Sequence, residues 1–260
     1  MATTIDYDES RPRHLWHARE YQVGSHPAIT EETGPFPSYS TVAGLYNNTA
    51  ALMAWAAKTN SAHYAAALAA LPAPIKTEDA IAVIADTGPY RRETKAAGDI
   101  GTDMHERFQE LLTGRRAKTV PTLTEGEART ILALQSWIKE MEYLQLTGEE
   151  IVADPRHRTA GRYDSIGSLN VLGGRRNVLV DLKTGKSVKP SGILQVAGYW
   201  GALVFAVKNL IDAAIILHAP IGCDRVTPHI LSLSDLEEHY RAFFAVRQLW
   251  DWHVKHGGLK

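Results

Sequence analysis

The sequence predicts an α/β fold in which a central mixed β-sheet is flanked by helices, with an N-terminal helical extension. Short aliphatic runs around 177–183 and 213–219 are typical of strands, and longer segments with helical periodicity lie before and after them. The chain has 260 residues, of which 45% are hydrophobic, so it is long enough for one sizeable core. A sheet covered by helices buries the apolar side of both kinds of element.

Residues 1–89 are predicted to form an N-terminal arm and helical extension within the same globule. The first 37 residues are polar and interrupted by Pro and Gly, so an irregular arm is expected there. Residues 40–71 are rich in alanine and are expected to be helical up to Pro72, because Ala favours helices and Pro disrupts them. A further short helix is expected over 79–85.

Residues 90–260 are predicted to form the core. Gly114 is placed to end a helix as its C-cap, and Thr124 with Glu127 matches a capping box, as does Ser234 with Glu237. With the apolar periodicity, these signals predict helices over 101–112 and from 125 to about 146, a strand over 150–153, a hairpin over 161–183, a helix over 190–208, strands over 213–219 and 225–231, and a helix from 234 onward.

The hairpin carries the most informative residues of the chain. Its turn is expected at Gly173-Gly174, because glycine adopts positive φ without penalty. Side chains alternate between the two faces of a strand, so Leu179, Asp181 and Lys183 share one face. The alternate residues of this strand share the other face, which is expected to join the core.

Pairing of the two hairpin strands is expected to bring Asp164 close to Asp181. Two carboxylates at that separation repel each other unless a cation lies between them. Lys183, on the same face, is placed to orient an attacking water or to stabilise developing charge. This combination is what metal-assisted cleavage of a phosphodiester requires.

Charge is distributed unevenly along the chain. The formal net charge is −1, so there is no overall basic footprint of the kind that nucleic-acid binders often show. Residues 151–190, in contrast, carry eight Lys or Arg against three Asp, a local charge of +5 around the hairpin. This segment either guides a polyanion toward the acidic centre or is a basic rim that favours solubility.

Cysteine content and hydropathy exclude several classes of protein. Cys223 is the single cysteine, which rules out an internal disulfide, a four-cysteine zinc site and a four-cysteine iron–sulfur cluster. No apolar run reaches the ~18 residues of a membrane span, and residues 1–9 do not resemble a secretory signal. A cytoplasmic protein without membrane partners is expected.

His105 lies on or beside the apolar face of the helix over 101–112, together with Phe108 and Leu112. A single histidine in such a position is often an ordinary core residue. If this helix packs on the sheet, however, the imidazole would point at the two carboxylates as a nitrogen ligand, which suits Mn²⁺ somewhat better than Mg²⁺.

Other candidate residues also allow two interpretations. Gln195 and Tyr199 are four residues apart and project from one helix face, either as a polar stripe beside the core or as part of the site. Arg91-Arg92 either hold phosphates or form a solvated turn. Arg162 either contacts the strand to be cleaved or caps the hairpin.

Taken in order, these residues resemble the PD-(D/E)xK nuclease superfamily, specifically its RecB-like branch with phage and CRISPR-associated exonucleases. The resemblance covers roughly residues 90–220. It rests on four pieces in sequence: His105, then Gly161-Arg162-Tyr163-Asp164, then Asp181-Leu182-Lys183-Thr184, then Gln195-Val196-Ala197-Gly198-Tyr199.

The resemblance implies a restriction-endonuclease-like core and a metal-dependent DNA exonuclease of phage-type recombination or repair. It implies one or two Mg²⁺ or Mn²⁺ ions, and no iron–sulfur cluster because Cys223 stands alone. Linear or single-stranded DNA ends are the implied substrate, a single-strand annealing or recombination protein is an implied partner, and the host cytoplasm is the implied location for a phage-encoded member. Monomer and homo-oligomer both stay open.

The implied site residues fall into three groups. The metal ligands are His105, Asp164, Asp181 and the Leu182 backbone carbonyl; the catalytic set is Lys183, Asp181, Asp164, Gln195 and Tyr199; and the DNA contacts are Arg91, Arg92, Arg162 and Lys186. Two alternatives remain: a non-catalytic DNA- or partner-binding module on the same fold, and an unrelated α/β protein with a chance acidic hairpin.

Overall fold

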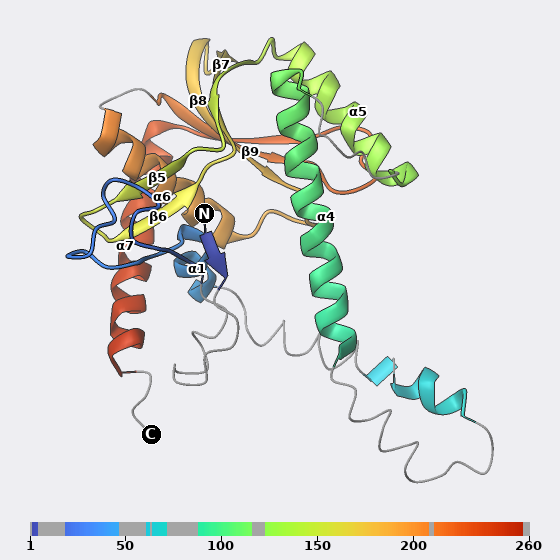
Figure 1. Ribbon diagram of the computed structural model, residues 1–260. Coiled ribbons are helices and arrows are strands. Elements are labelled where there is room, and N and C mark those ends of the chain that lie inside the picture. Colours follow the sequence, from blue (N-terminus) through green and yellow to red (C-terminus); the bar gives the residue numbers. More distant parts are fainter. Residues whose placement is uncertain are drawn as a thin grey trace. The chain divides into compact units, whose positions relative to one another are not determined.

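The computed structural model describes residues 2–4, 19–46, 61–62, 64–71, 88–115, 123–207 and 211–256 (Figure 1). The chain divides into two units. One comprises Met1–Asn47 together with Met104–Lys260, and the other comprises Asn48–Asp103. The central sheet and all the site residues discussed below, except Arg91 and Arg92, belong to the first unit.

A five-stranded sheet forms the centre of the first unit, with the strand order β10-β9-β8-β7-β4. β8 and β9 run parallel and the other neighbouring pairs are antiparallel, so the sheet is mixed, as predicted. The strands are β4 (Leu144–Gly148), β7 (Ser165–Val171), β8 (Gly174–Lys183), β9 (Ala213–His218) and β10 (Thr227–Leu231).

Helices cover both faces of this sheet (Figure 1). One face packs against α5 (Glu125–Glu140) and the C-terminal part of α4 (Gly88–Thr113), and it buries Val178 and Val180. The other packs against α1 (Tyr39–Ala43), α6 (Pro190–Val207) and α7 (Leu233–His256). The Val178 face of β8 joins the core, as expected, and Leu179 is buried on the second face as well.

β7 and β8 form the predicted hairpin, but its turn lies one residue earlier in the sequence than expected. Ser165 pairs with Val180 at one end and Val171 with Gly174 at the other. The turn is therefore Leu172-Gly173, with φ of +51° and +78°, and Gly174 already belongs to β8. A two-residue hairpin turn with both central residues at positive φ follows the right-handed twist of the strands. Leu172 adopts this conformation because the flanking strand register imposes it.

The helix predicted from 125 to about 146 begins as expected but ends earlier. Thr124 and Glu127 make both hydrogen bonds of the predicted capping box. The helix stops at Glu140, and Glu142, with φ of +47°, reverses the chain into β4, so extending the helix to residue 146 was wrong. Residues 144–148 are strand because they complete the edge of the sheet beside β7.

The later elements agree with the prediction, apart from one cap. The helix over 190–208 and the strand pair are α6, β9 and β10. The C-terminal helix starts at Leu233, and its capping box is formed by Ser232 and Asp235. The backbone N–H of Ser232 donates to the Asp235 carboxylate, and the backbone N–H of Asp235 donates to the Ser232 hydroxyl. The expected box at Ser234 and Glu237 was therefore two residues too late.

The N-terminal segment is more regular than expected. Three short strands, β1 (Ala2–Thr4), β2 (Arg19–Tyr21) and β3 (Phe36–Pro37), form a small sheet. Buried residues of this segment pack on the separate two-stranded sheet of β5 (Ile151–Asp154) and β6 (Thr159–Arg162). These contacts are made with a distant part of the chain, so local composition does not reveal the strands.

The alanine-rich region is helical in part. α1 ends at Ala43 and is followed by a 3₁₀ turn, Gly44–Tyr46, so the expected helix does not continue from residue 40. Residues 64–69 are helical, as predicted. The short helix predicted over 79–85 lies outside the described residues. α4 starts at Gly88, so Arg91 and Arg92 belong to a helix and not to a turn.

Candidate functional site

The hairpin register brings the two candidate carboxylates together. Asp164 lies in the break between β6 and β7, directly before Ser165, whose partner on β8 is Val180. Asp164 is therefore opposite Asp181, and its Oδ2 atom accepts a hydrogen bond from the backbone N–H of Leu182 (2.7 Å). Asp181 is 2% exposed, so its carboxylate is held away from bulk water.

The Leu182 carbonyl lies on the same side of β8 as Asp164. The Lys183 carbonyl accepts a hydrogen bond from Ala219, beyond β9, and the Leu182 N–H points the opposite way, to Asp164. In an extended strand the N–H and C=O of one residue point to the same side. The carbonyl predicted as a metal ligand is thus directed toward the carboxylates.

Helix α4 places His105 against Asp164. The Nδ1 atom of His105 lies 3.1 Å from Oδ1 of Asp164. One turn further along, Gln109 Nε2 donates to the Asp164 backbone carbonyl (2.7 Å), and Gln145 Nε2 on β4 donates to Gln109 Oε1 (3.0 Å). We did not predict Gln109 from the sequence, although its position four residues after His105 puts it on the same helix face.

Lys183 links the carboxylates to helix α6. Its Nζ atom lies 2.7 Å from Asp181 Oδ2, an ion pair without the geometry of a directed hydrogen bond. The same ammonium donates to Gln195 Oε1 (3.2 Å), and Gln195 Nε2 donates to the Tyr199 hydroxyl (2.8 Å). The structure therefore joins Gln195 and Tyr199 to the carboxylate cluster, which the sequence alone left open.

Burial and neighbouring charges shift the pKa values of the cluster in opposite directions. Burial alone would lower the pKa of His105 and raise that of Asp164, but their mutual attraction and hydrogen bond outweigh burial, so the pKa of His105 is raised and that of Asp164 lowered. Burial and the charge of Asp164 raise the pKa of Asp181 despite Lys183. Burial would lower the pKa of Lys183, but Asp181 and Asp164 raise it.

The donor set of the cluster fits a divalent cation. Two carboxylates, a backbone carbonyl and one imidazole are ligands that suit Mg²⁺ or Mn²⁺. Burial and the charge of Asp164 raise the pKa of Asp181 despite Lys183, so a cation beside both carboxylates would favour their ionised forms. Within the described ranges, no group of three His, Cys, Asp or Glu side chains already stands close enough together to hold a metal ion.

The residues predicted to contact DNA lie outside the carboxylate cluster or outside the described side chains. Arg162 is exposed at the end of β6, two residues before Asp164. Lys186 is exposed in the loop between β8 and α6. The side chains of Arg91 and Arg92 lie outside the described part of α4. Among the described side chains, Arg162 and Lys186 make no hydrogen bond or ion pair with the carboxylate cluster.

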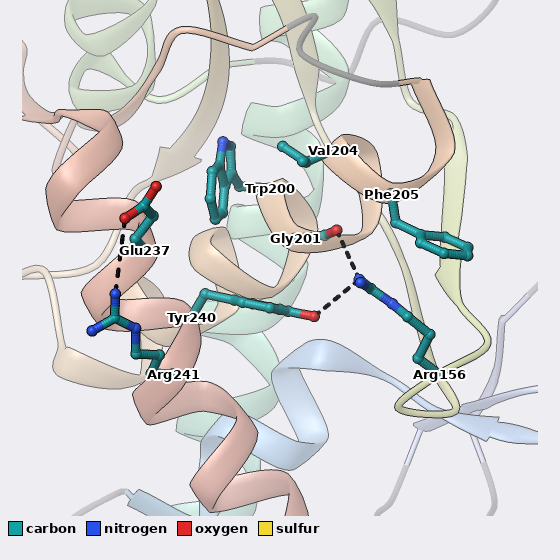
Figure 2. Close-up of a pocket in the computed structure, with 8 residues that line it drawn as sticks. All are labelled: Arg156, Trp200, Gly201, Val204, Phe205, Glu237, Tyr240 and Arg241. Carbon is teal, nitrogen blue, oxygen red and sulfur yellow. Dashed lines mark hydrogen bonds and ion pairs between the residues drawn. The ribbon is translucent and has the colours of Figure 1, made fainter.

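A separate polar network surrounds Asp154, next to a surface pocket of about 480 Å³ (Figure 2). Asp154 is 1% exposed and accepts hydrogen bonds from Arg156 (2.9 Å from Nε and from Nη2) and from Tyr240 (2.9 Å). Arg156 also donates to the Gly201 carbonyl (3.3 Å), as Figure 2 shows. The network fastens the β5–β6 turn to α6 and α7, and no pocket-lining residue belongs to the carboxylate cluster.

Replacement of Asp154 by asparagine is expected to destabilise the protein by roughly 2 kcal/mol. It weakens the charge-assisted hydrogen bonds that the buried Asp154 carboxylate accepts from the half-exposed Arg156 and from Tyr240. Burial would raise the pKa of Asp154, but Arg156, His157 and Tyr240 hold it lower. Stabilisation is therefore present above the unfolded pKa of about 4 and is lost as the pH falls through the folded value.

Urea unfolding at pH 7 and at pH 3 measures this effect. Asp224→Asn is the matched control, since Asp224 is 83% exposed and pairs with the exposed Arg129 at 3.6 Å. The interpretation fails if Asp154→Asn is no less stable than Asp224→Asn at pH 7, or if the difference between wild type and Asp154→Asn does not shrink at pH 3.

Fold and site together define an α/β protein whose mixed sheet carries a partly buried cluster of carboxylates, lysine and histidine. No protein-family model matches the chain, and no curated protein matches it. No described helix is long and apolar enough to cross a membrane. A fold class is compatible with many functions, so the function has to be inferred from the side chains of the site.

Proposed function

We propose that the protein is a metal-dependent deoxyribonuclease with a restriction-endonuclease-like core, acting as an exonuclease in recombination or repair of the phage type. The observation that carries the proposal is one partly buried cluster. In it His105 lies against Asp164, Asp164 lies opposite Asp181, and Lys183 pairs with Asp181. A cytoplasmic location and an annealing or recombination protein as partner belong to the same proposal.

The carboxylates, His105 and the Leu182 carbonyl would hold one or two Mg²⁺ or Mn²⁺ ions. Such an ion acts as a Lewis acid that acidifies a bound water and stabilises charge on phosphoryl oxygens. Asp164 is held for this role by the Leu182 N–H, and His105 is oriented by its contact with Asp164. Gln109 limits movement of Asp164 by bonding its backbone carbonyl.

Lys183 would orient the attacking water or stabilise negative charge on the phosphate. Its ammonium stays protonated, because Asp181 and Asp164 raise its pKa despite burial. Gln195 holds the ammonium from the α6 side, and Tyr199 fixes the Gln195 amide. The lysine is therefore a positioned cation whose location is set by Asp181 and Gln195, with Tyr199 behind Gln195.

DNA is the proposed substrate because the acidic centre lies within a basic segment. The net charge of +5 over residues 151–190 favours a polyanion, while the metal would neutralise the carboxylates that face it. Arg162 and Lys186 are exposed and are proposed to contact phosphates without reading base sequence. Arg91 and Arg92 stay predicted contacts.

A non-catalytic binding module on this fold explains the site less well. Burying Asp181 beside Asp164 costs free energy, as the raised pKa of Asp181 indicates. A protein that only bound DNA or a partner would gain nothing from keeping two facing carboxylates under a lysine. Catalysis with a metal gives these residues a use.

Digestion of end-labelled linear DNA and closed circular DNA, with Mg²⁺, Mn²⁺ or EDTA, tests the proposal. We expect metal-dependent degradation of linear DNA, no cleavage in EDTA and intact circular DNA, because an exonuclease needs an end. Nicking of circular DNA would change the assignment to an endonuclease. Absence of cleavage with either metal, for both single- and double-stranded substrates, would contradict the nuclease proposal.

A further inference from the structure

Tyr39, at the start of α1, occupies a slot between β6 and α6. Two glycines leave room for its ring. A Cβ atom on Gly198 would lie 2.5 Å from Tyr39 Cδ1, and a Cβ atom on Gly161 would lie 2.7 Å from Tyr39 Cδ2 and 2.5 Å from Tyr199 Cε1. Any larger residue at either position would displace the rings, so both glycines are explained by these two tyrosines.

The two tyrosine rings contact each other edge to face. Their centroids are 5.0 Å apart with an interplanar angle of 74°, a favourable aromatic geometry. Tyr39 is itself fixed by a hydrogen bond from its hydroxyl to the Thr159 carbonyl (3.4 Å) and by the adjacent bridge between Ser38 and Ala160. The Tyr199 ring therefore rests on a support that comes from the N-terminal segment.

We propose that Tyr39 is a positioning residue for the nuclease reaction, an inference that rests on the proposed function. It holds the Tyr199 ring, Tyr199 holds the Gln195 amide, and Gln195 holds the Lys183 ammonium. The N-terminal segment around α1 thus takes part in setting the position of the lysine. Tyr39 itself need not touch substrate.

An ordinary core role for Tyr39 has to be separated from a positioning role. Phe243 on α7 provides the matched control, because it is buried and packs on Tyr39 with ring centroids 5.4 Å apart. Phe243→Leu and Tyr39→Leu both remove one aromatic ring from this cluster. Only Tyr39→Leu removes the ring that is in contact with Tyr199.

The kinetic test measures kcat and KM for DNA cleavage at a temperature where every variant is folded. We expect Tyr39→Leu to lower kcat by about tenfold with little change in KM, and Tyr39→Phe and Phe243→Leu to stay near wild type. In a Gln195→Ala background, Tyr39→Leu should lower kcat no further, because the connection is already broken.

A second readout does not need activity. The Gln195 side-chain amide signals in the ¹⁵N–¹H NMR spectrum are assigned by their loss in Gln195→Ala. They should shift in Tyr39→Leu and stay in place in Phe243→Leu. The proposal is overturned if the Gln195 amide signals do not shift in Tyr39→Leu. It is also overturned if Tyr39→Leu lowers kcat by the same factor in the Gln195→Ala background as in wild type. An inactive wild type would refute the nuclease function, while the NMR result would still decide whether Tyr39 positions Gln195.

Discussion

Asp181→Ala is expected to abolish DNA cleavage, with a loss of kcat of at least about 10³-fold, because it removes a central ligand of the proposed metal site. The fold should persist. Burial and Asp164 raise the pKa of Asp181, so its charge opposes folding in the absence of metal. Lys183, once unpaired, can hydrate, because its side chain is 26% exposed. The melting temperature of the metal-free variant should therefore equal or exceed that of wild type.

Melting with and without Mn²⁺ separates metal binding from folding. Ligands that bind only the native state raise its stability, so Mn²⁺ should stabilise the wild type and not Asp181→Ala. Asp224→Ala is the matched control, since Asp224 is 83% exposed and its ion pair with Arg129 is long (3.6 Å). Cleavage by Asp181→Ala at the wild-type rate, in a preparation free of wild type, would refute the assignment.

Lys183→Ala is expected to abolish cleavage while keeping metal binding. The ammonium is not a ligand, and it repels a cation placed between Asp164 and Asp181, so the affinity for Mn²⁺ should be unchanged or higher. The chemical step should nevertheless slow by about 10²-fold or more, because a positioned charge near the phosphate is lost. A lower rate of cleavage with unchanged Mn²⁺ affinity would distinguish Lys183 from the metal ligands, whose loss lowers both.

Lys186→Ala is the control for a general loss of positive charge. Lys186 is exposed three residues further along, and its replacement should raise KM and reduce the salt dependence of binding with little effect on kcat. If Lys183→Ala and Lys186→Ala had equal kcat values, Lys183 would be only a DNA contact. If Lys183→Ala no longer bound Mn²⁺, the lysine would be needed to build the metal site.

The hairpin at the centre of the sheet could be predicted from the sequence, because it leaves two local signals. These are the alternation of side chains along a strand and the glycines at the turn. They were sufficient to pair β7 with β8 and to bring Asp164 opposite Asp181, even with the turn one residue out. The same local reasoning mistook residues 144–146 for the end of a helix. That edge strand forms because β7 is beside it, which local periodicity does not encode.

The supports of the site were harder to predict than its charged residues. Gln109 acts on the Asp164 backbone, and Tyr39 reaches Tyr199 across about 160 residues of sequence. The Tyr39 contact leaves no periodic pattern, and the spacing of Gln109 from His105 indicates a shared helix face but not its partner, because both contacts depend on tertiary packing. Gly161 and Gly198 were the indirect signal, since each marks a place where an aromatic ring comes close to the backbone.

Calorimetric titration of the purified protein with Mn²⁺ tests the central claim most directly, comparing wild type with Asp164→Asn. Asparagine keeps an acceptor for the Leu182 N–H, so the fold is retained while the ligand charge is lost. We predict that wild type binds one or two ions and that Asp164→Asn binds at least about 100-fold more weakly. Equal binding by the two proteins, or no binding by a wild type that cleaves DNA, would contradict the proposed metal site.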